Sequence, residues 1–194
     1  MFNYSVGKID DNLIGMSRGK RTKHRGRKVI KIFPDSSWLI ASLSLKDSHH
    51  THVEQSLGFL RPLNPTFYVS TIVVMETVTG LIKSGMTVAN SIAKIRKFIE
   101  DLHCRTQRPL ELDWILKKYK VFAKARKIKK LTTMDFYIVT EGMLIGAKIL
   151  TADKDMYRHT KKSYKDIYLI SDKVKGMKSD LPRLTENITY NLKA

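Results

Sequence analysis

The sequence predicts an α/β fold built on a parallel sheet, and two observations carry that prediction. Short apolar segments bounded by Pro, Gly or Asp are typical of buried strands, and longer segments with helical periodicity lie between them. Strands separated by helices form parallel β-α-β units, with helices on both faces of the sheet. The 194 residues suffice for one such domain, and the single cysteine, Cys104, excludes a disulfide framework.

The first half of the domain alternates strand and helix. The pattern predicts strands at 29–33 and 66–69 and helices at 36–45, 49–60, 70–82 and 87–102. The helix at 70–82 is expected to break at Gly80 or Gly85. The last helix is strongly amphipathic, so its apolar face should pack on the core; that face holds Val88, Ile92, Ile95, Phe98, Ile99 and Leu102.

The second half repeats the alternation. Helices are predicted at 112–125 and at 133–145, the second ended by Gly146, and strands at 148–150 and 167–170. Ligands of parallel α/β sheets bind beyond the carboxyl ends of the strands. The residues that follow the strands are therefore the candidates for a functional site.

Charge is the strongest signal in the composition. Lys and Arg number 36 and Asp and Glu 18, so the net charge is 36 − 18 = +18. Residues 17–31 and 117–130 each hold eight cationic side chains and no acid. One such run is also typical of a solvated helix face or tail, but two of them favour a polyanion partner, nucleic acid first. The candidate RNA-binding residues are Arg18, Lys20, Arg21, Lys23, Arg25, Arg27, Lys28, Lys117, Lys118, Lys120, Lys124, Arg126, Lys127, Lys129 and Lys130.

The sequence gives no sign of a membrane segment. No apolar run approaches the ~18 residues that a membrane span needs. Asp10 and Asp11 interrupt the N-terminus, and its basic run follows the apolar residues, so a signal peptide is not expected. We expect a soluble, cytoplasmic protein with no membrane partner.

Four acids stand in otherwise uncharged surroundings. Asp35 follows the first predicted strand, and Asp153 follows the strand at 148–150. Glu76 is the only charged residue between Leu63 and Ile82, and Asp135 opens the helix at 133–145. In the open-sheet arrangement, Asp35 and Asp153 both fall at carboxyl ends of strands.

Each aspartate also has a purely structural explanation. Asp35 fits the N-cap of the following helix, Asp135 fits a capping box with Thr132, and Asp153 fits a turn. Glu76 has no capping role, and a buried lone carboxylate is costly unless it is paired or binds a cation.

Converging carboxylates repel one another, and a divalent cation relieves that repulsion. Hard oxygen ligands select Mg²⁺ or Mn²⁺, which can activate a water and stabilise a leaving oxygen in phosphodiester hydrolysis. On a basic surface, this combination predicts a metal-dependent nuclease or phosphodiesterase.

Three segments carrying these acids resemble the PIN-domain ribonucleases, and among them the VapC-like toxins. They are FPDSSWLIA (33–41), STIVVMETVTGL (70–81) and LTTMDFYIVTEGMLIGAKILTADKDM (131–156). The resemblance covers residues 29–171. It implies a Rossmann-like α/β/α sandwich with a parallel sheet of four to five strands, preceded by a basic arm at 1–28 and followed by an extension at 172–194.

The resemblance also implies a function and a site. The family's acids hold Mg²⁺ or Mn²⁺ and hydrolyse RNA, and Asp35, Glu76, Asp135 and Asp153 match them as catalytic metal ligands. Supporting roles fall to the residues that flank these acids, namely Ser37, Thr151 and Asp155. VapC-like toxins are shorter and begin almost at the first strand, so the two extensions leave an RNA-processing enzyme or a component of an RNA-containing complex open beside a toxin with an antitoxin.

Two further alternatives remain open at this level. PIN domains often form homodimers, so a homodimer is one of the arrangements that the resemblance leaves open. A non-catalytic RNA- or ribosome-associated protein that uses the PIN fold as a scaffold would explain the charge equally well. Retention of all four acids favours the enzyme, because a scaffold has no need of carboxylates that repel one another.

The basic arm generates the first prediction. Deleting residues 1–28 should weaken the affinity for RNA and flatten its dependence on salt, because each lost phosphate contact lowers the number of released counterions. The measurement is the RNA dissociation constant across a series of KCl concentrations. An unchanged salt slope would show that the arm serves another partner.

Overall fold

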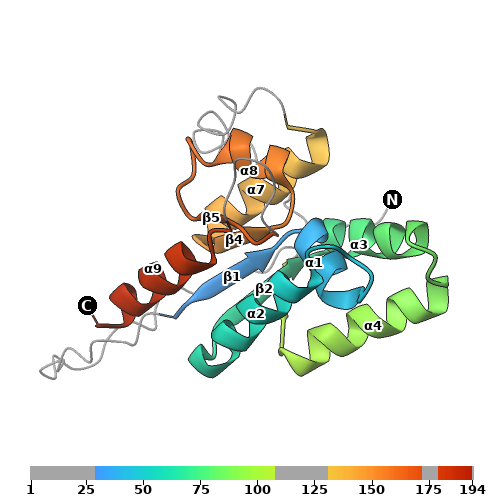
Figure 1. Ribbon diagram of the computed structural model, residues 1–194. Coiled ribbons are helices and arrows are strands. Elements are labelled where there is room, and N and C mark those ends of the chain that lie inside the picture. The colour runs from blue at the N-terminus through green and yellow to red at the C-terminus, as the bar shows by residue number, and fades with distance from the viewer. Residues whose placement is uncertain (1–28, 108–130, 172–178, 194) are drawn as a thin grey trace, which may run out of the picture.

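The strands form one parallel sheet with the order β3-β2-β1-β4-β5, which confirms the predicted α/β class. This computed structural model describes residues 29–107, 131–171 and 179–193 (Figure 1). The strands are β1 (Lys31–Pro34), β2 (Thr66–Ser70), β3 (Arg105–Gln107), β4 (Lys148–Thr151) and β5 (Ile167–Leu169). β1 lies at the centre of the sheet, with β2 and β4 on either side.

Helices cover both faces of the sheet. The described helices are α1 (Ser36–Leu43), α2 (His50–Leu60), α3 (Thr71–Lys83), α4 (Val88–Asp101), α7 (Thr133–Ile145), α8 (Lys154–Thr160) and α9 (Leu181–Lys193), with a short 3-10 helix η1 (Arg61–Leu63). The helices α1 to α4 lie on one side of the sheet and α7 and α8 on the other (Figure 1). None of the helices in this part of the chain is long and apolar enough to cross a membrane.

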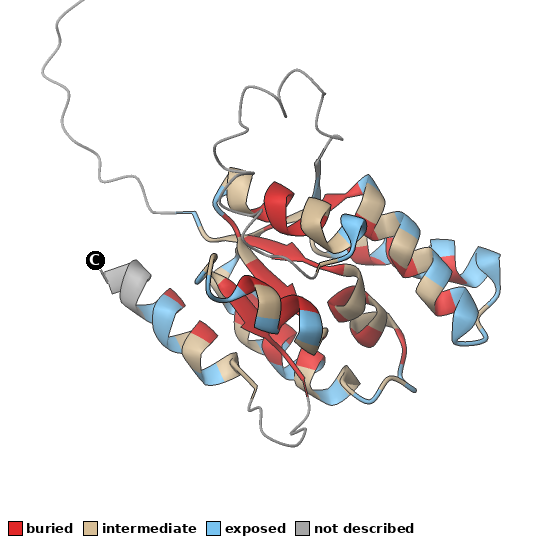
Figure 2. Ribbon diagram, turned by 90° about the horizontal axis from the view of Figure 1, so that it is seen from above, coloured by how far each residue is buried: buried red, intermediate tan, exposed pale blue. Residues whose placement is uncertain are grey.

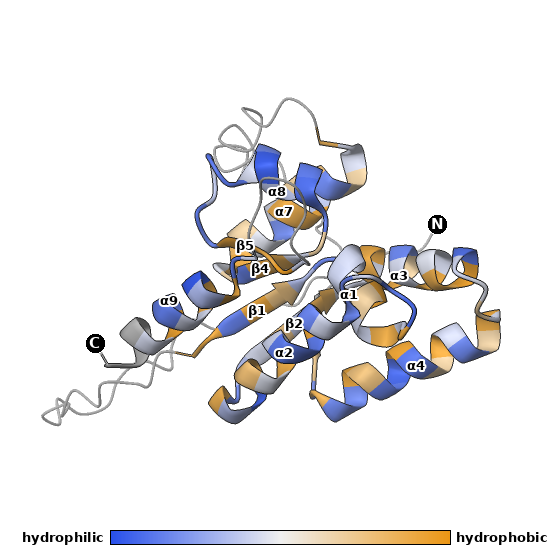
Figure 3. Ribbon diagram, viewed as in Figure 1, coloured by the Kyte–Doolittle hydropathy of each residue, from blue (hydrophilic) through white to orange (hydrophobic). Residues whose placement is uncertain are grey.

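The core lies along the central strands. Ile32 and Phe33 of β1 and Ile149 of β4 are completely buried, as are all three residues of β5 (Figure 2). These strands are largely hydrophobic, whereas α2, α4 and α9 mix both kinds of residue (Figure 3). Burial from both faces explains why the strands are apolar runs without alternation.

The prediction that the third helix could break at Gly80 is wrong. α3 runs through Gly80, and the chain leaves the helix only at Ser84 and Gly85, where Gly85 has a φ of 92°. Gly80 lies against α1, because a Cβ atom there would come within 2.2 Å of the Cδ1 atom of Ile40. This glycine therefore serves the packing of two helices rather than a turn.

The prediction for the apolar face of α4 is only partly right. Ile95 and Phe98 are buried, but Val88 is 55% and Ile92 44% exposed. α4 packs against α3, and Ile92 lines an apolar pocket between the two helices, so an amphipathic pattern alone overestimates the burial there.

Among the described residues, four elements escaped the sequence analysis, namely β3, η1, α8 and α9. β3, η1 and α8 are short, so hydrophobic periodicity gives little signal for them. α9 does show a helical spacing of apolar residues, at Leu181, Leu184 and Ile188, but it lies in the stretch that was predicted as an extension. The predicted helix at 112–125, the basic arm at 1–28 and the RNA-binding candidates all lie outside the described residues.

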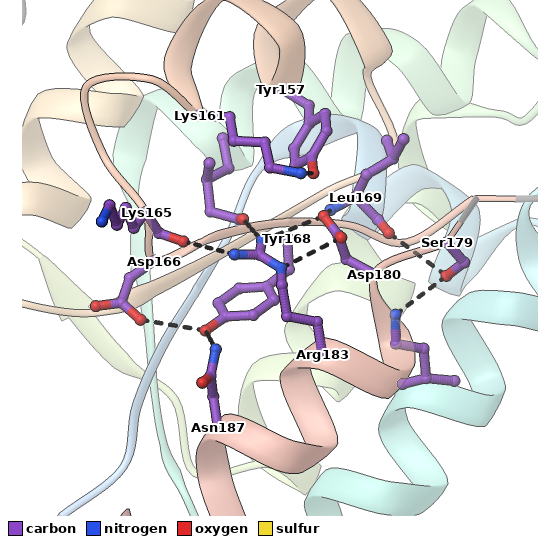
Figure 4. A network of polar contacts seen from close by, with 12 residues as sticks. Tyr157, Lys161, Lys165, Asp166, Tyr168, Leu169, Ser179, Asp180, Arg183 and Asn187 are labelled. Atoms are coloured by element: carbon purple, nitrogen blue, oxygen red, sulfur yellow. Dashed lines mark hydrogen bonds and ion pairs between the residues drawn. The ribbon is translucent and has the colours of Figure 1, made fainter. Parts of the chain in front are cut away.

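α9 falls within the stretch predicted as a C-terminal extension and packs against the sheet. Its Leu184 and Ile188 are completely buried, and the helix contacts the edge strand β5. Arg183 donates hydrogen bonds to the carbonyl oxygens of Lys165, at 3.0 Å, and Ile167 (Figure 4). These bonds occupy carbonyl groups beside an edge strand that would otherwise be open to another chain.

Arg183 is the centre of this contact. Its guanidinium also pairs with Asp180 at 3.2 Å and lies 4.3 Å above the centre of the Tyr168 ring. Asp180 in turn accepts a hydrogen bond from the backbone N–H of Leu169, at 3.2 Å. A planar guanidinium can make all these contacts at once, whereas an ammonium group cannot.

Replacement of Arg183 should therefore destabilise the domain. We expect Arg183→Ala to lower the free energy of unfolding by about 2–3 kcal/mol, because hydrogen bonds of a charged group and a cation–π contact are lost together. Urea unfolding followed by circular dichroism measures the change. Lys97→Ala is the matched control: its ion pair with Asp101 is solvent-exposed, and its loss should cost less than about 1 kcal/mol. Equal effects of the two substitutions would contradict the anchoring role.

Candidate functional site

Asp35 lies at the C-terminal end of β1, at the point where the central strand meets α1. It is only 2% exposed and forms the N-cap of α1, accepting a hydrogen bond from the backbone N–H of Trp38 at 2.8 Å. The hydroxyl group of Ser37 lies 2.8 and 2.9 Å from its two carboxylate oxygens, and the hydroxyl of Thr151 donates to Oδ2 at 2.6 Å. The capping role suggested by the sequence is therefore confirmed.

The carboxyl group of Asp35 is difficult to ionise in this position. Burial raises its pKa to about 7, although the hydrogen bonds from Thr151, Trp38 and Ser37 act in the opposite direction. The negative charge of Asp153 raises the pKa further. The effect of burial on the pKa is therefore larger than the opposing effect of the three hydrogen bonds. In such an environment, a nearby cation has its largest effect on the pKa of a carboxyl group.

Ser37 and Thr151 connect the ends of β1 and β4. The Ser37 hydroxyl accepts a hydrogen bond from the backbone N–H of Ala152 at 2.9 Å, and the Thr151 hydroxyl accepts one from that of Asp153 at 2.9 Å. Both residues were predicted to support the acids. The observed bonds fix Asp35 relative to the loop that carries Asp153.

Glu76 is linked to the same end of the sheet through α1. It is half-buried on α3, and its Oε2 atom accepts a hydrogen bond from the Ser36 hydroxyl at 2.9 Å. Ser36 directly follows Asp35, so the bond connects α3 to the first turn of α1. The Oε1 atom of Glu76 makes no hydrogen bond to the described residues.

Asp135 and Asp153 both take part in capping the N-terminus of a helix. Asp135 completes the predicted capping box with Thr132, whose hydroxyl lies 2.7 Å from Oδ2. Asp153 caps α8, and its Oδ1 atom accepts from the backbone N–H groups of Asp155 and Met156 at 2.7 and 2.9 Å. In each case one oxygen is engaged and the other has no hydrogen bond to the described residues, so capping leaves a ligand atom available.

The chemistry of this donor set fits a hard divalent cation. The available groups are carboxylate and hydroxyl oxygens, which suit Mg²⁺ or Mn²⁺. The structure brings Asp35 near Asp153 and links Glu76 to them through Ser36. Within residues 29–107, 131–171 and 179–193, however, no three acidic, His or Cys side chains gather closely enough to form a complete metal site.

Asp155 lies apart from this arrangement. Its carboxylate is exposed and pairs with Arg158 at 3.1 Å. The supporting role predicted for Asp155 has no contact in favour of it, whereas its backbone N–H does help to fix Asp153.

Glu141 is an acid that the sequence analysis did not single out. It lies in the middle of α7, is only 1% exposed, and neither of its carboxylate oxygens has a hydrogen-bond partner among the described residues. Burial raises its pKa to about 7, an effect that the neighbouring Ser70 hydroxyl partly offsets. Its neighbours in the sequence, Ile138 and Val139 among them, are apolar. The local sequence therefore gave no reason to distinguish Glu141 from the helix residues that pack in the core.

The parallel sheet, with polar side chains along the ends of its central strands, defines a doubly wound α/β protein whose candidate site lies at the carboxyl ends of the strands. A family model for the PIN domain matches residues 32–162, which is more than half of the chain. The protein therefore belongs to the PIN-domain family. PIN domains are typically nucleases and generally use divalent metal ions.

The comparison with solved structures includes a bacterial toxin. Mycobacterium tuberculosis VapC20, a toxin that cleaves the sarcin–ricin loop, is 17% identical in sequence and superimposes with a TM-score of 0.49. The match covers 66% of this chain and 93% of the toxin. No curated protein matches the chain.

The two buried acids generate a prediction for stability. The pKa values of Asp35 and Glu141 rise from 3.8 and 4.5 to about 7 on folding, so between pH 4 and 7 the folded protein binds more protons than the unfolded chain. The metal-free protein should therefore lose stability as the pH rises through this window, by on the order of 3 kcal/mol per group. Urea unfolding in EDTA at pH 5 and pH 7.5 measures the effect.

The double variant Asp35→Asn, Glu141→Gln should show a much weaker pH dependence, because neither side chain then ionises. Asp101→Asn, a substitution of an exposed acid on α4, should leave the dependence as it is in the wild type. Stability that stays constant or rises between pH 5 and 7.5 in the wild type would contradict the raised pKa values.

Proposed function

We propose that the protein is a metal-dependent endoribonuclease that hydrolyses phosphodiester bonds of RNA at the C-terminal end of its sheet. The observation that carries the proposal is the buried Asp35, held by two hydroxyl groups at the end of the central strand of a PIN domain. Around it, Glu76 and Asp153 keep one carboxylate oxygen each for a ligand. We assign the metal ligands to Asp35, Glu76, Asp135 and Asp153.

Each residue has a separate task in this proposal. Asp35 supplies the central carboxylate, and Ser37 and Thr151 hold it in a fixed orientation. Glu76 and Asp153 supply oxygens from two further elements, and Asp135 supplies one from the start of α7. When bound, Mg²⁺ or Mn²⁺ would neutralise these acids, polarise a phosphate oxygen and lower the pKa of a coordinated water.

The charge of the chain supports RNA as the substrate. A net charge of +18 attracts a polyanion, while the acids at the sheet would repel its phosphates in the absence of a cation. Binding and cleavage are thus expected to have different requirements: the lysines and arginines bind the backbone, and the acids with their metal cut it.

The main alternative is a non-catalytic RNA-binding protein that uses the PIN fold as a scaffold. The raised pKa of Asp35 favours the enzyme, because a scaffold would be more stable with a neutral residue at this buried position. An antitoxin, an RNA-containing complex and a homodimer are partners that both functions allow. Isolation of the protein with an antitoxin would distinguish a toxin from an RNA-processing enzyme.

The test is cleavage of a mixed RNA pool by the purified protein in Mn²⁺, in Mg²⁺ and in EDTA. We expect cleavage that requires the metal and falls by at least about 100-fold in Asp35→Asn and Asp135→Asn, since loss of one charge-stabilising group costs about that much. Products are resolved on a denaturing gel.

Asp101→Asn serves as the matched control, because Asp101 is an exposed aspartate that pairs with Lys97 on α4. It should cleave at the rate of the wild type. RNA binding without cleavage in either metal would favour the scaffold and reject the nuclease.

A further inference from the structure

Positive charge in the described part of the chain is concentrated in one short segment, residues 154–165. This segment holds five Lys or Arg and one Asp, a net charge of 5 − 1 = +4. The rest of the described residues hold 11 Lys or Arg and 12 Asp or Glu, a net charge of 11 − 12 = −1. The charge is therefore a local property of this segment and not the consequence of a uniformly basic domain.

The segment begins at the candidate site. Lys154 directly follows Asp153, whose carboxylate caps α8. β4 and β5 are parallel, so α8 and the turn after it return from the C-terminal end of β4 to the N-terminal end of β5. The segment therefore runs from the site along one face of the sheet, where α8 contacts both strands (Figure 1).

Burial separates the segment into two sides. The buried residues of α8 are Met156, Tyr157 and Thr160. The cationic residues lie at the surface, with Lys154 half-buried and the others exposed, namely Arg158, Lys161, Lys162 and Lys165. Residues three or four positions apart share one face of a helix, so Lys154, Arg158 and Lys161 follow one another along the outer side of α8 over about 10 Å.

The described residues hold these cations in place without neutralising most of them. The ammonium group of Lys161 donates a hydrogen bond to the Tyr157 hydroxyl and lies 4.7 Å from the centre of its ring. A neutral phenol leaves that positive charge intact. Arg158 pairs with Asp155, whereas Lys154, Lys162 and Lys165 form no ion pair within the described part of the chain. The side chain of Lys165 extends away from the contacts of Arg183 (Figure 4).

A single strand of nucleic acid fits such a surface. Proteins that bind single strands follow the backbone with cationic side chains. Asp35 and Asp153 at the neighbouring site repel phosphate groups, so a strand that reaches this site needs positive charge close beside it. An anionic membrane does not fit, because Met156 and Tyr157 are buried and cannot enter the lipid.

We propose that residues 154–165 form a binding surface for the phosphodiester backbone of RNA, which holds the part of the strand next to the candidate site. The inference rests on the proposed function, because RNA is the substrate proposed for that site. It places an RNA contact within the folded domain, whereas the RNA-binding residues predicted from the sequence all lie outside the described residues.

The test is the affinity of the full-length protein for a short, fluorescein-labelled single-stranded RNA, measured by anisotropy in EDTA across a series of KCl concentrations. We expect the double variant Lys162→Gln, Lys165→Gln to raise the dissociation constant about tenfold at about 0.1 M salt. The slope of log Kd against log salt should fall by about 1.4, because each lost phosphate contact removes about 0.7 from it. Lys162→Arg, Lys165→Arg keeps both charges and should bind as the wild type does.

Lys83→Gln, Arg96→Gln is the matched control. It removes the same charge from two exposed residues on α3 and α4, on the other side of the sheet, and should leave the affinity unchanged. An unchanged affinity in the Lys162, Lys165 glutamine variant would overturn the proposal. An equal loss in the control would also overturn it, because only the net charge would then matter.

Cleavage in Mn²⁺ separates this proposal from the proposed function. The Lys162, Lys165 glutamine variant should have a raised KM and an unchanged kcat, because these contacts lie away from the bond that is cut. A wild type that binds RNA through this segment without cleaving it would support the surface and reject the nuclease. Metal-dependent cleavage with wild-type affinity and KM in the variant would reject the surface and leave the nuclease standing.

Discussion

The burial of the Asp35 carboxylate at the end of the central strand is the constraint on which the site depends. A carboxylate is tolerated there because hydroxyl groups from α1 and β4 and a backbone N–H of α1 surround it. The same bonds join β1 to β4 and begin α1, so the fold and the site share their interactions. Even so, burial still raises the pKa of Asp35 to about 7. A nearby positive charge would stabilise the ionised carboxylate, and the described residues do not supply one.

Capping and metal binding are compatible uses of the same acids. The sequence raised them as competing explanations, and the structure shows why they need not compete. A cap engages one oxygen with N–H or hydroxyl donors, as Asp153 does through Oδ1 and Asp135 through Oδ2. The second oxygen remains for a ligand, and the cap fixes its direction. A helix N-terminus that orders a carboxylate in this way lowers the entropy cost of binding a cation.

The sequence predicted the fold class and most elements because the central strands are buried on both faces and are bounded by strong turn residues. β1, which ends at Pro34 and is followed by Asp35, and α7, ended by Gly146 with a φ of 64°, show this best. β3 escaped prediction because it is a strand of only three residues. α9 shows a helical spacing of apolar residues, but its packing against β5 depends on long-range contacts, such as those of Arg183 with the carbonyl oxygens beside β5. Hydrophobic periodicity does not predict such contacts.

The site shows the same division between local and long-range information. Asp35, Glu76 and Asp153 were selected as candidates because each is isolated in an uncharged segment or follows a strand, and both properties are local. Glu141 was missed because its burial results from the close approach of α7 to the sheet at Gly142. That approach cannot be inferred from a helix considered alone. A buried acid on such a helix becomes visible only when the distance between helix and sheet is known, and burial without a partner among the described residues then identifies it more directly than its spacing does.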